Sequence, residues 1–379
     1  MSRNIIINTL GIRDSGGITV LDKVLNECLH DKLNSYVIVC NSNKNINTLY
    51  SIYKDTSHFT FEFFNISSLL YRLYIENIIF RRLYKRYHVE LIYNFSGSAQ
   101  FYIKIPQLIK LHDLSFFSRS VDEAFFLKKR YFKWLQRVFF KRLVFSSMVG
   151  QSDYIEMQSN HVQNYVSDFV NISNKRLFLK SDINIEKSNF QNPVEMDSNR
   201  KLRIIYIVGP HFESIHKNFD IFIQAMLNLK DKGVDFEIII TLTRGQLHRS
   251  NLWSRSLDDY TTFLGYTPRY ELMKSFQNNT ILVSTSIIET LGLHVIEAIQ
   301  NGVAVIVPNE KYSLSVYGPS VLTYETFDYN TLVEIIENID SQSYSAIKSM
   351  VVKNQNFLIS NEGLKFHHIV EIFNIILKK

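Results

Sequence analysis

The sequence predicts an α/β protein of two domains that face a central cleft, each built on a parallel sheet. Three observations support this prediction. Short apolar runs alternate with helical stretches in both halves of the chain, as in βαβ units. The 379 residues exceed one typical core. The polar, aperiodic residues 181–200 lie between the two series and are interpreted as a linker. Ligands of such sheets bind beyond the carboxyl ends of strands, so functional residues are sought in the loops there.

The first domain is expected to cover residues 1–180. Its expected strands are 4–10, 35–41, 90–95 and 107–114. A glycine-containing loop follows the first strand, and a helix is expected from Val20 to about Leu33. Residues 144–157 are interpreted as a strand and a serine-rich turn, followed by a helix with Ser152 or Asp153 as its N-cap.

The second domain is expected to cover residues 201–360. Its expected strands are 202–209, 236–242 and 280–286, and its expected helices include 217–233 and 269–279. Residues 361–379 contain an amphipathic pattern that predicts a C-terminal helix, which could pack back on the first domain.

Composition narrows the class of protein. Apolar residues make up 46% of the chain and charged residues 21%, which is typical of a globular protein. The two cysteines, Cys28 and Cys40, have neither metal-ligand nor disulfide-framework spacing. The N-terminus lacks the apolar core of a signal peptide, and no window is long enough to span a membrane. We therefore expect a cytoplasmic protein.

Charge differs between the two halves. Residues 1–190 carry 25 Lys and Arg against 16 Asp and Glu, a balance of +9, whereas residues 191–379 carry 17 against 20, a balance of −3. Such asymmetry indicates that the first half faces something anionic. Compositional drift toward Lys and Arg is the alternative explanation.

Two glutamates frame a glycine in the stretch 286–308. Glu289 and Glu297 stand on either side of Gly292, and the sequence predicts a helix from Gly292 or Leu293 to about Gln300. The unpaired amides of the first turn and the helix dipole favour an anion such as a diphosphate. Carboxylates on both sides can accept hydrogen bonds from sugar and ribose hydroxyls, which favours a nucleotide-sugar site. Two surface glutamates on an ordinary helix–loop unit are the alternative.

The segment "STSIIETLGLHVIEAIQNGVAVIVPN" resembles the E-x7-E signature of glycosyltransferase family 4, which comprises retaining enzymes of the GT-B fold. Further resemblances follow in the family's order: "RDSGGITV", "IKLHDLSFF", "IIYIVGPHFESIHKNFDIFIQAMLNL" and "FLGYTPRYELMKSF". The resemblance implies two Rossmann-like domains and the transfer of a sugar from a nucleotide-sugar donor. It covers nearly the whole chain and is more specific in the second half.

The resemblance also implies roles for single residues. His112 and Glu289 would contact the transferred sugar at the reaction centre. The implied donor-binding residues are Gly16, Gly17, Lys217, Tyr266, Thr267, Leu291, Gly292, Leu293 and Glu297. Among these, Lys217 would pair with the diphosphate, Glu297 would hold the ribose, and Tyr266 and Thr267 would lie by the base. Where the family usually has an arginine the chain has His211, so Arg244 is the alternative phosphate-site cation.

No D-x-D, H-E-x-x-H or Cys/His cluster occurs, so no metal and no further cofactor is expected. The implied acceptor is a glycan or a lipid-linked saccharide, and bacterial surface polysaccharide or O-antigen assembly is the implied setting. Two alternatives stay open: a non-transferase GT-B enzyme such as a nucleotide-sugar epimerase or phosphorylase, and an inactive scaffold that binds membrane or glycan.

The stretch 125–145 combines basic and aromatic residues with no acidic residue. Lys129, Lys133, Arg137 and Lys141 recur every four residues beside an apolar face, a pattern typical of a helix at a membrane surface. An ordinary helix that covers the sheet is the alternative. No nucleic-acid motif accompanies the stretch, so the expected partner is the inner face of the cytoplasmic membrane.

Overall fold

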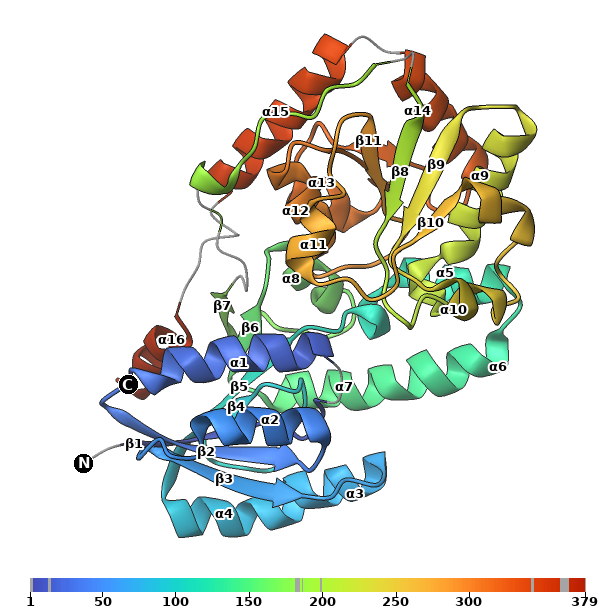
Figure 1. Ribbon diagram of the computed structural model, residues 1–379. Helices are drawn as coiled ribbons and strands as arrows, with labels where there is room; N and C mark the ends of the chain where they lie inside the picture. The colour runs from blue at the N-terminus through green and yellow to red at the C-terminus, as the bar shows by residue number, and fades with distance from the viewer. Residues whose placement is uncertain are drawn as a thin grey trace. The chain divides into compact units, whose positions relative to one another are not determined.

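The computed structural model describes residues 3–12, 15–180, 185, 187–197, 200–341, 344–361 and 368–378. They divide into two compact units. Unit 1 comprises the described residues within 1–117, 136–184 and 363–379, and unit 2 comprises those within 118–135 and 185–362. Each unit has one parallel sheet covered by helices (Figure 1), which confirms the predicted α/β class.

Unit 1 is built on a sheet in the order β3-β2-β1-β4-β5-β6-β7. Its strands are β1 (Arg3–Asn8), β2 (Asn34–Asn41), β3 (Phe59–Phe64), β4 (Val89–Asn94), β5 (Gln107–Leu111), β6 (Tyr154–Met157) and β7 (Arg176–Leu179). Side chains alternate between two cores: Ile5 and Ile7 enter one, and Ile6 enters the other. A strand buried on both faces accounts for the unbroken apolar run at the N-terminus.

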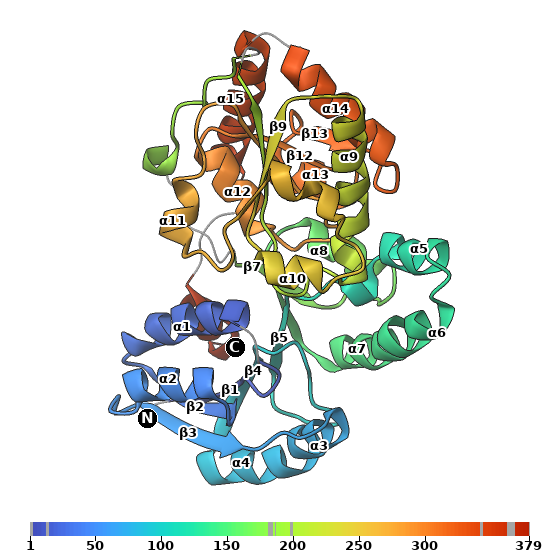
Figure 2. The same ribbon diagram turned by 45° about the vertical axis from the view of Figure 1, so that its right-hand side comes forward.

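Helices cover both faces of this sheet (Figure 2). They are α1 (Ser15–Leu29), α2 (Lys44–Tyr53), α3 (Leu69–Tyr74), α4 (Phe80–Tyr87), α7 (Phe140–Gln151), α8 (His161–Ser167) and α16 (Ile369–Leu377). Helices α1, α2 and α16 share the core of Ile5 and Ile7, and α4 packs against the opposite face. The C-terminal helix therefore belongs to unit 1, in contact with α1 and β4.

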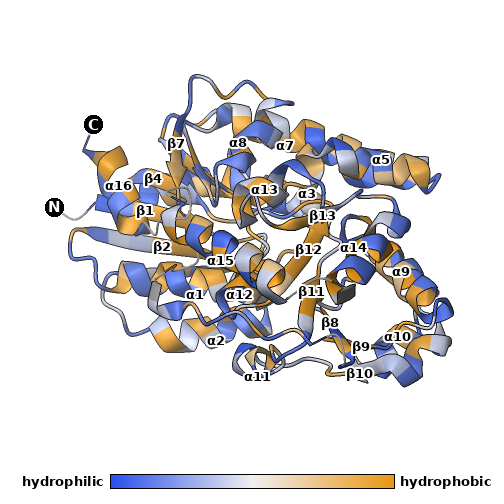
Figure 3. Ribbon diagram, turned by 90° about the horizontal axis from the view of Figure 1, so that it is seen from above, coloured by the Kyte–Doolittle hydropathy of each residue, from blue (hydrophilic) through white to orange (hydrophobic). Residues whose placement is uncertain are grey.

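Unit 2 has a sheet in the order β10-β9-β8-β11-β12-β13. Its strands are β8 (Leu202–Tyr206), β9 (Phe236–Ile240), β10 (Thr261–Phe263), β11 (Thr280–Val283), β12 (Ala304–Pro308) and β13 (Leu322–Tyr324). The central strands β11 and β12 are fully buried and strongly hydrophobic (Figure 3). The order reverses direction between β8 and β11, so the loops after these two strands are neighbours.

The helices of unit 2 include two that belong to the first half of the sequence. The set is α5 (Arg119–Leu127), α6 (Tyr131–Trp134), α9 (Phe219–Asp231), α10 (Arg244–His248), α11 (Arg269–Met273), α12 (Leu293–Gln300), α13 (Lys311–Tyr317), α14 (Tyr329–Ser341) and α15 (Tyr344–Ser360). Helices α9 and α14 share a core with one face of the sheet. Helix α12 packs against β12 and α15.

Two expected boundaries differ from the structure. Residues 118–135 were expected in the first domain but cluster with unit 2, because α5 packs there. The expected linker also bonds to unit 2 where it is described: the amide of Gln191 donates to the carbonyl of Gln300, and that of Val194 donates to Gly302. These contacts satisfy backbone donors that a free linker would leave to water.

Three local expectations were wrong. Residues 144–157 form the end of a helix and then a strand, the reverse of the predicted order, and Ser152 is the C-cap of α7. Helix α1 begins at Ser15 rather than at Val20, so Gly16 and Gly17 lie in its first turn and not in a loop before it.

The third wrong expectation is a single basic helix over residues 125–145, because the helix is interrupted at Lys129. Lys129 has a φ of 53°, and the amides of Lys129 and Arg130 donate to Phe126 and Phe125, which closes α5 in a Schellman motif. Lys129 therefore lies outside the helix that carries Lys133, Arg137 and Lys141.

Candidate functional site

Lys217 lies at the carboxyl end of the unit 2 sheet, in a short 3-10 turn formed by Ile215–Lys217. Its backbone carbonyl accepts a hydrogen bond of 2.7 Å from the hydroxyl of Thr285, which itself lies 2.7 Å from the hydroxyl of buried Tyr206. The amide of Ile287 donates to the carbonyl of His216 at 2.7 Å. The loops after β8 and β11 are thus bonded together, and this fixes the position of the lysine.

The ammonium of Lys217 pairs with Glu289. Its Nζ lies 2.7 Å from Oε1 of Glu289 and 3.3 Å from the hydroxyl of Ser286. Burial raises the pKa of Glu289, but the charges of Lys217 and the hydrogen bonds around the carboxylate outweigh it and lower the pKa to about 2. The carboxylate is ionised at neutral pH. Its contribution to stability is present above its ordinary pKa of 4.5 and is lost as the pH falls toward 2.

His294 was not singled out from the sequence. It is the second residue of α12, and its Nε2 lies 3.2 Å from the hydroxyl of Ser284. Burial lowers its pKa to about 4, although the charge of Glu289 acts in the opposite direction. The imidazole is therefore neutral at neutral pH and adds no positive charge beside Lys217.

The predicted start of α12 is confirmed. Gly292 is its N-cap in the left-handed region, with φ 56° and ψ 59°, and a Cβ there would overlap the hydroxyl of Tyr317. Leu291 is buried and Leu293 is 39% exposed. The first-turn amides therefore follow a backbone conformation that glycine adopts without strain.

Glu297 lies one turn into α12 and pairs with Arg269, the first residue of α11. The guanidinium Nε of Arg269 is 2.7 Å from Oε1 of Glu297; the side chain of Arg269 is 66% exposed and that of Glu297 is 12% exposed. Tyr266 and Thr267 lie in the loop before α11, after Gly265 with its φ of 66°. The ring of Tyr266 is 91% exposed. The structure thus brings Glu297 to the loop where the base is expected, through a pair that the sequence did not predict.

The two alternative phosphate-site cations occupy different loops. His211 is exposed in the turn after β8, where its carbonyl accepts from the amide of Ser214. Arg244 is the first residue of α10, is 61% exposed, and lies 3.9 Å from Asp258 with its guanidinium over the ring of Phe263. Both belong to carboxyl-end loops of unit 2.

The remaining expected residues belong to unit 1. His112 directly follows β5, is exposed, and lies over Gly97, whose φ of 76° and missing side chain leave room for the imidazole. Gly16 and Gly17 occupy the first turn of α1, which follows β1. All three thus lie at carboxyl ends of unit 1 strands, the edge where ligands of such sheets bind.

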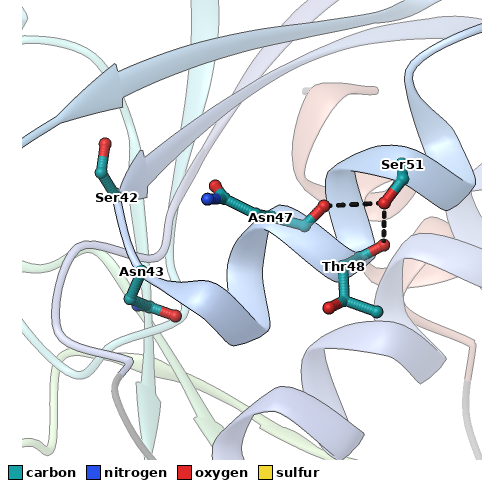
Figure 4. A pocket seen from close by; sticks show the side chains of 5 residues that line it. All are labelled: Ser42, Asn43, Asn47, Thr48 and Ser51. Carbon is teal, nitrogen blue, oxygen red and sulfur yellow. Dashed lines mark hydrogen bonds between the residues drawn. The ribbon is translucent and has the colours of Figure 1, made fainter.

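A polar hollow of about 540 Å³ lies at the start of α2 (Figure 4). Its described lining consists of Ser42, Asn43, Asn47, Thr48 and Ser51. The side chain of Asn43 caps α2 by accepting from the amide of Ile46, and the hydroxyl of Ser51 donates to backbone carbonyls of the same helix. These polar groups serve the helix itself, and none of the five titrates near neutral pH.

Within the described part of the chain, no group of three or more His, Cys, Asp or Glu side chains is arranged to hold a metal ion. None of the described helices combines the length and apolar character that a bilayer-spanning segment needs.

Comparison with solved structures identifies the fold. The chain superposes on sucrose-phosphate synthase from Thermosynechococcus elongatus with a TM-score of 0.67 at 14% identity, covering 99% of both chains. It superposes on the lipopolysaccharide outer core galactosyltransferase WaaB with a TM-score of 0.63 at 13% identity, again covering 99% of both chains. For WaaG, a glycosyltransferase involved in lipopolysaccharide biosynthesis, the TM-score is 0.62 at 12% identity, over 99% of this chain and 100% of that one. The protein therefore has the GT-B fold of glycosyltransferases.

Sequence comparison agrees with this class. Residues 192–343 match the family described as glycosyl transferases group 1, and this region carries Lys217, Glu289 and Glu297. The match covers most of unit 2, so the chain contains a region of this family within a GT-B fold. No curated protein sequence matches the chain.

Proposed function

We propose that the protein transfers a sugar from a nucleotide-sugar donor to a glycan or lipid-linked acceptor, with retention of configuration. The observation that carries this proposal is the Lys217–Glu289 pair, 2.7 Å apart, in the loops beside the N-terminus of α12. A cation and the amides at a helix N-terminus suit a diphosphate, and a carboxylate suits the hydroxyls of a sugar joined to it.

In this mechanism the donor diphosphate binds the first-turn amides of α12 and the ammonium of Lys217. The bond between the anomeric carbon and the phosphate oxygen breaks, and the acceptor oxygen bonds to the same face of that carbon. The acceptor proton passes to an oxygen of the departing phosphate, so the products are the glycosylated acceptor and a nucleoside diphosphate. Lys217 stabilises the charge on that leaving group without a metal. His112 and Glu289 hold the transferred sugar.

Further donor contacts follow from the same proposal. Glu297 holds the ribose hydroxyls, and the base lies against Tyr266 and Thr267. The family usually has an arginine at the position of His211. In this chain Arg244 takes that role and adds positive charge near the phosphates. Gly16 and Gly17 allow close approach of backbone to the donor phosphates. Assembly of a bacterial surface polysaccharide such as O-antigen is the proposed setting.

The Glu297→Gln variant tests the ribose assignment. Losing a hydrogen bond to a charged acceptor costs about 1.5–3 kcal/mol, so we expect affinity for the nucleoside diphosphate to fall by about one to two decades. The Glu289→Gln variant should instead lower turnover more than nucleotide affinity. Titration calorimetry with UDP, GDP and ADP measures the first effect, and donor turnover over a nucleotide-sugar panel measures the second.

Exposed Glu271 on α11 provides the matched control, because its carboxylate pairs with the exposed ammonium of Lys274 at 3.1 Å, three residues further along the chain. Glu271→Gln should bind and turn over as wild type does. Full activity in both Glu289→Gln and Glu297→Gln would show that the two glutamates are ordinary surface residues without a role in donor binding. Donor breakdown without any acceptor product would favour a non-transferase enzyme. Activity that is lost in the presence of a chelator and restored by Mg²⁺ or Mn²⁺ would contradict the metal-free mechanism.

We further propose that the helical stretch 131–151 binds an anionic membrane surface. Lys133, Arg137 and Lys141 are exposed, as are Phe132 and Phe140 beside them at 71% and 54%. Both kinds of residue occur along α7 (Figure 3).

A second stretch of unit 1 has the same composition. Helices α3 and α4 and the π-helical turn between them, Ile75–Ile79, expose Leu70, Tyr71, Tyr74 and Ile78 together with Arg81, Arg82, Lys85 and Arg86. In Figures 1 and 2, α3 and α7 lie near one another on the same side of unit 1. Aromatic and basic side chains exposed on both helices suit the headgroup region of a bilayer.

Reversing Lys129, Lys133, Arg137 and Lys141 to Glu should weaken binding to vesicles of anionic lipid by more than tenfold. Each basic residue near such a surface contributes about 1 kcal/mol. Co-sedimentation measures the binding. The control reverses the exposed residues Lys32, Lys54, Lys348 and Lys353, which gives the same change in net charge elsewhere. Equal losses in the two variants would show that net charge alone matters. No loss in either variant would show that this stretch does not bind the membrane surface.

A further inference from the structure

Helix α5 follows the His112 loop in sequence but packs in unit 2. Five residues separate His112 from Ser118, where unit 2 begins. The side chain of Ser118 caps α5 by accepting from the amide of Val121, and the helix packs against the 3-10 turn that carries Lys217. A segment of the first half of the chain therefore touches the candidate phosphate site directly.

Two side chains tie α5 to three carboxyl-end loops. At one end, the hydroxyl of Ser120 donates to Oε2 of Glu310 at 2.9 Å, and the hydroxyl of Thr326 donates to Oε1 of the same carboxylate at 2.9 Å. At the other end, Nζ of Lys128 lies 2.6 Å from Oδ1 of Asp220 and 3.4 Å from Oδ1 of Asn218.

Asn218 connects the contacts at the two ends of α5. Its Nδ2 donates to the carbonyl of Thr326 at 2.8 Å, so α5, Glu310, Thr326, Asn218 and Lys128 form one closed circuit of hydrogen bonds. We name this circuit the α5 clamp.

The backbone of Asn218 explains why a clamp is needed there. Its φ of 47° places a non-glycine residue in the left-handed region, where the contacts of its side chain stabilise it. The residue is 1% exposed, ends the 3-10 turn and begins α9. The conformation of Asn218 sets the direction in which the preceding Lys217 leaves the turn.

We infer that Lys128 is a positioning residue, which acts through Asn218 and Asp220 to hold Lys217 against Glu289. The inference rests on the proposed function only for its effect on turnover, because the geometric effect is independent of the substrate.

Lys128→Met tests the inference. We expect turnover of the nucleotide-sugar donor to fall about tenfold or more, because displacing a reacting group by about 1 Å can cost up to 10²-fold. Lys128→Arg should restore most of it. Lys232→Met is the matched control, because Lys232 pairs with Glu337 at 2.9 Å from the opposite end of α9. The control should retain wild-type turnover.

A double variant separates positioning from general stability. If Lys128 acts through Lys217, then Lys128→Met should cause no further loss in a Lys217→Met background. An equal loss in both backgrounds would overturn the inference, and so would wild-type turnover in Lys128→Met. Should Lys128→Met fail to fold, Asp220→Asn removes the same ion pair from the other side and is subjected to the same comparisons.

A crystal structure of Lys128→Met provides a readout that needs no substrate. The expected result is loss of the 2.7 Å contact between Lys217 and Glu289, or departure of Asn218 from the left-handed region. Retention of both would overturn the inference even if activity fell. If wild type turned over no donor, the proposed function would fail, and the crystal structure would still decide whether Lys128 positions Lys217.

Discussion

Replacing Lys217 by methionine is expected to lower turnover by about 10²–10³-fold, the usual cost of losing one group that stabilises charge in a transition state. Methionine keeps the length of the apolar stem, and the backbone of this residue is held by Thr285 rather than by its own side chain. The measurement is steady-state turnover of the donor, together with calorimetric affinity for its nucleoside diphosphate. Lys217→Arg should retain more activity than Lys217→Met, because the charge persists.

The Lys217→Met variant should also differ from wild type in how its free energy of unfolding depends on pH. Without Lys217, burial of Glu289 is opposed less strongly, so its pKa should rise from about 2. A lowered pKa stabilises the folded protein at pH values above the unfolded pKa. The stability difference between wild type and Lys217→Met should therefore be smallest near pH 2 and increase as the pH rises past 4.5. A difference independent of pH would contradict the pairing, and unchanged turnover would contradict the leaving-group role.

The second large effect is expected for Gly292→Ala. A left-handed conformation costs a non-glycine residue about 1–2 kcal/mol, and overlap of the new Cβ with buried Tyr317 adds about 1–3 kcal/mol. We expect a loss of about 2–5 kcal/mol in the free energy of unfolding. Affinity for the nucleoside diphosphate should fall as well, because Gly292 precedes the amides that are proposed to bind it. Denaturant titration and calorimetry measure these two losses.

Tyr317 supplies the control for this experiment. Its hydroxyl is buried and has no hydrogen-bond partner within the described residues, so Tyr317→Phe alone should cost little. The Gly292→Ala/Tyr317→Phe double variant should recover the part of the loss that comes from overlap but not the part that comes from backbone strain. Failure of the second substitution to recover any stability would show that Tyr317 does not limit the space at Gly292.

The local expectations that succeeded depend on short-range rules. Gly292 and Gly302 mark the ends of α12 because each has a positive φ, and the apolar run 304–308 is a strand because both of its faces are buried. The basic stretch 125–145 failed for a related reason. Its charge periodicity continues through Lys129, but a lysine in the left-handed region ends α5 there, and periodicity does not report such a break.

Residues missed by the sequence act through partners far away in the chain. Arg269 meets Glu297 from a different helix, Thr285 bonds the carbonyl of Lys217, and Lys128 reaches Asp220 across 92 positions of sequence. The only local signal was the serine-threonine-serine run at 284–286. It indicates the end of a strand but does not predict which residues bond to it.

The sequence by itself determined the α/β class, both parallel sheets, the strand-to-helix unit around Gly292 and the family resemblance, because these depend on periodicity, turn chemistry and a spaced motif within short windows. Only the tertiary structure decided that Lys217 pairs with Glu289, that Glu297 meets Arg269, and that residues 118–135 join unit 2. The physical reason is that these contacts arise where separate loops converge at the carboxyl edge of a sheet. Strand order and the burial of each side chain set that convergence, and neither is encoded in any one stretch of the chain.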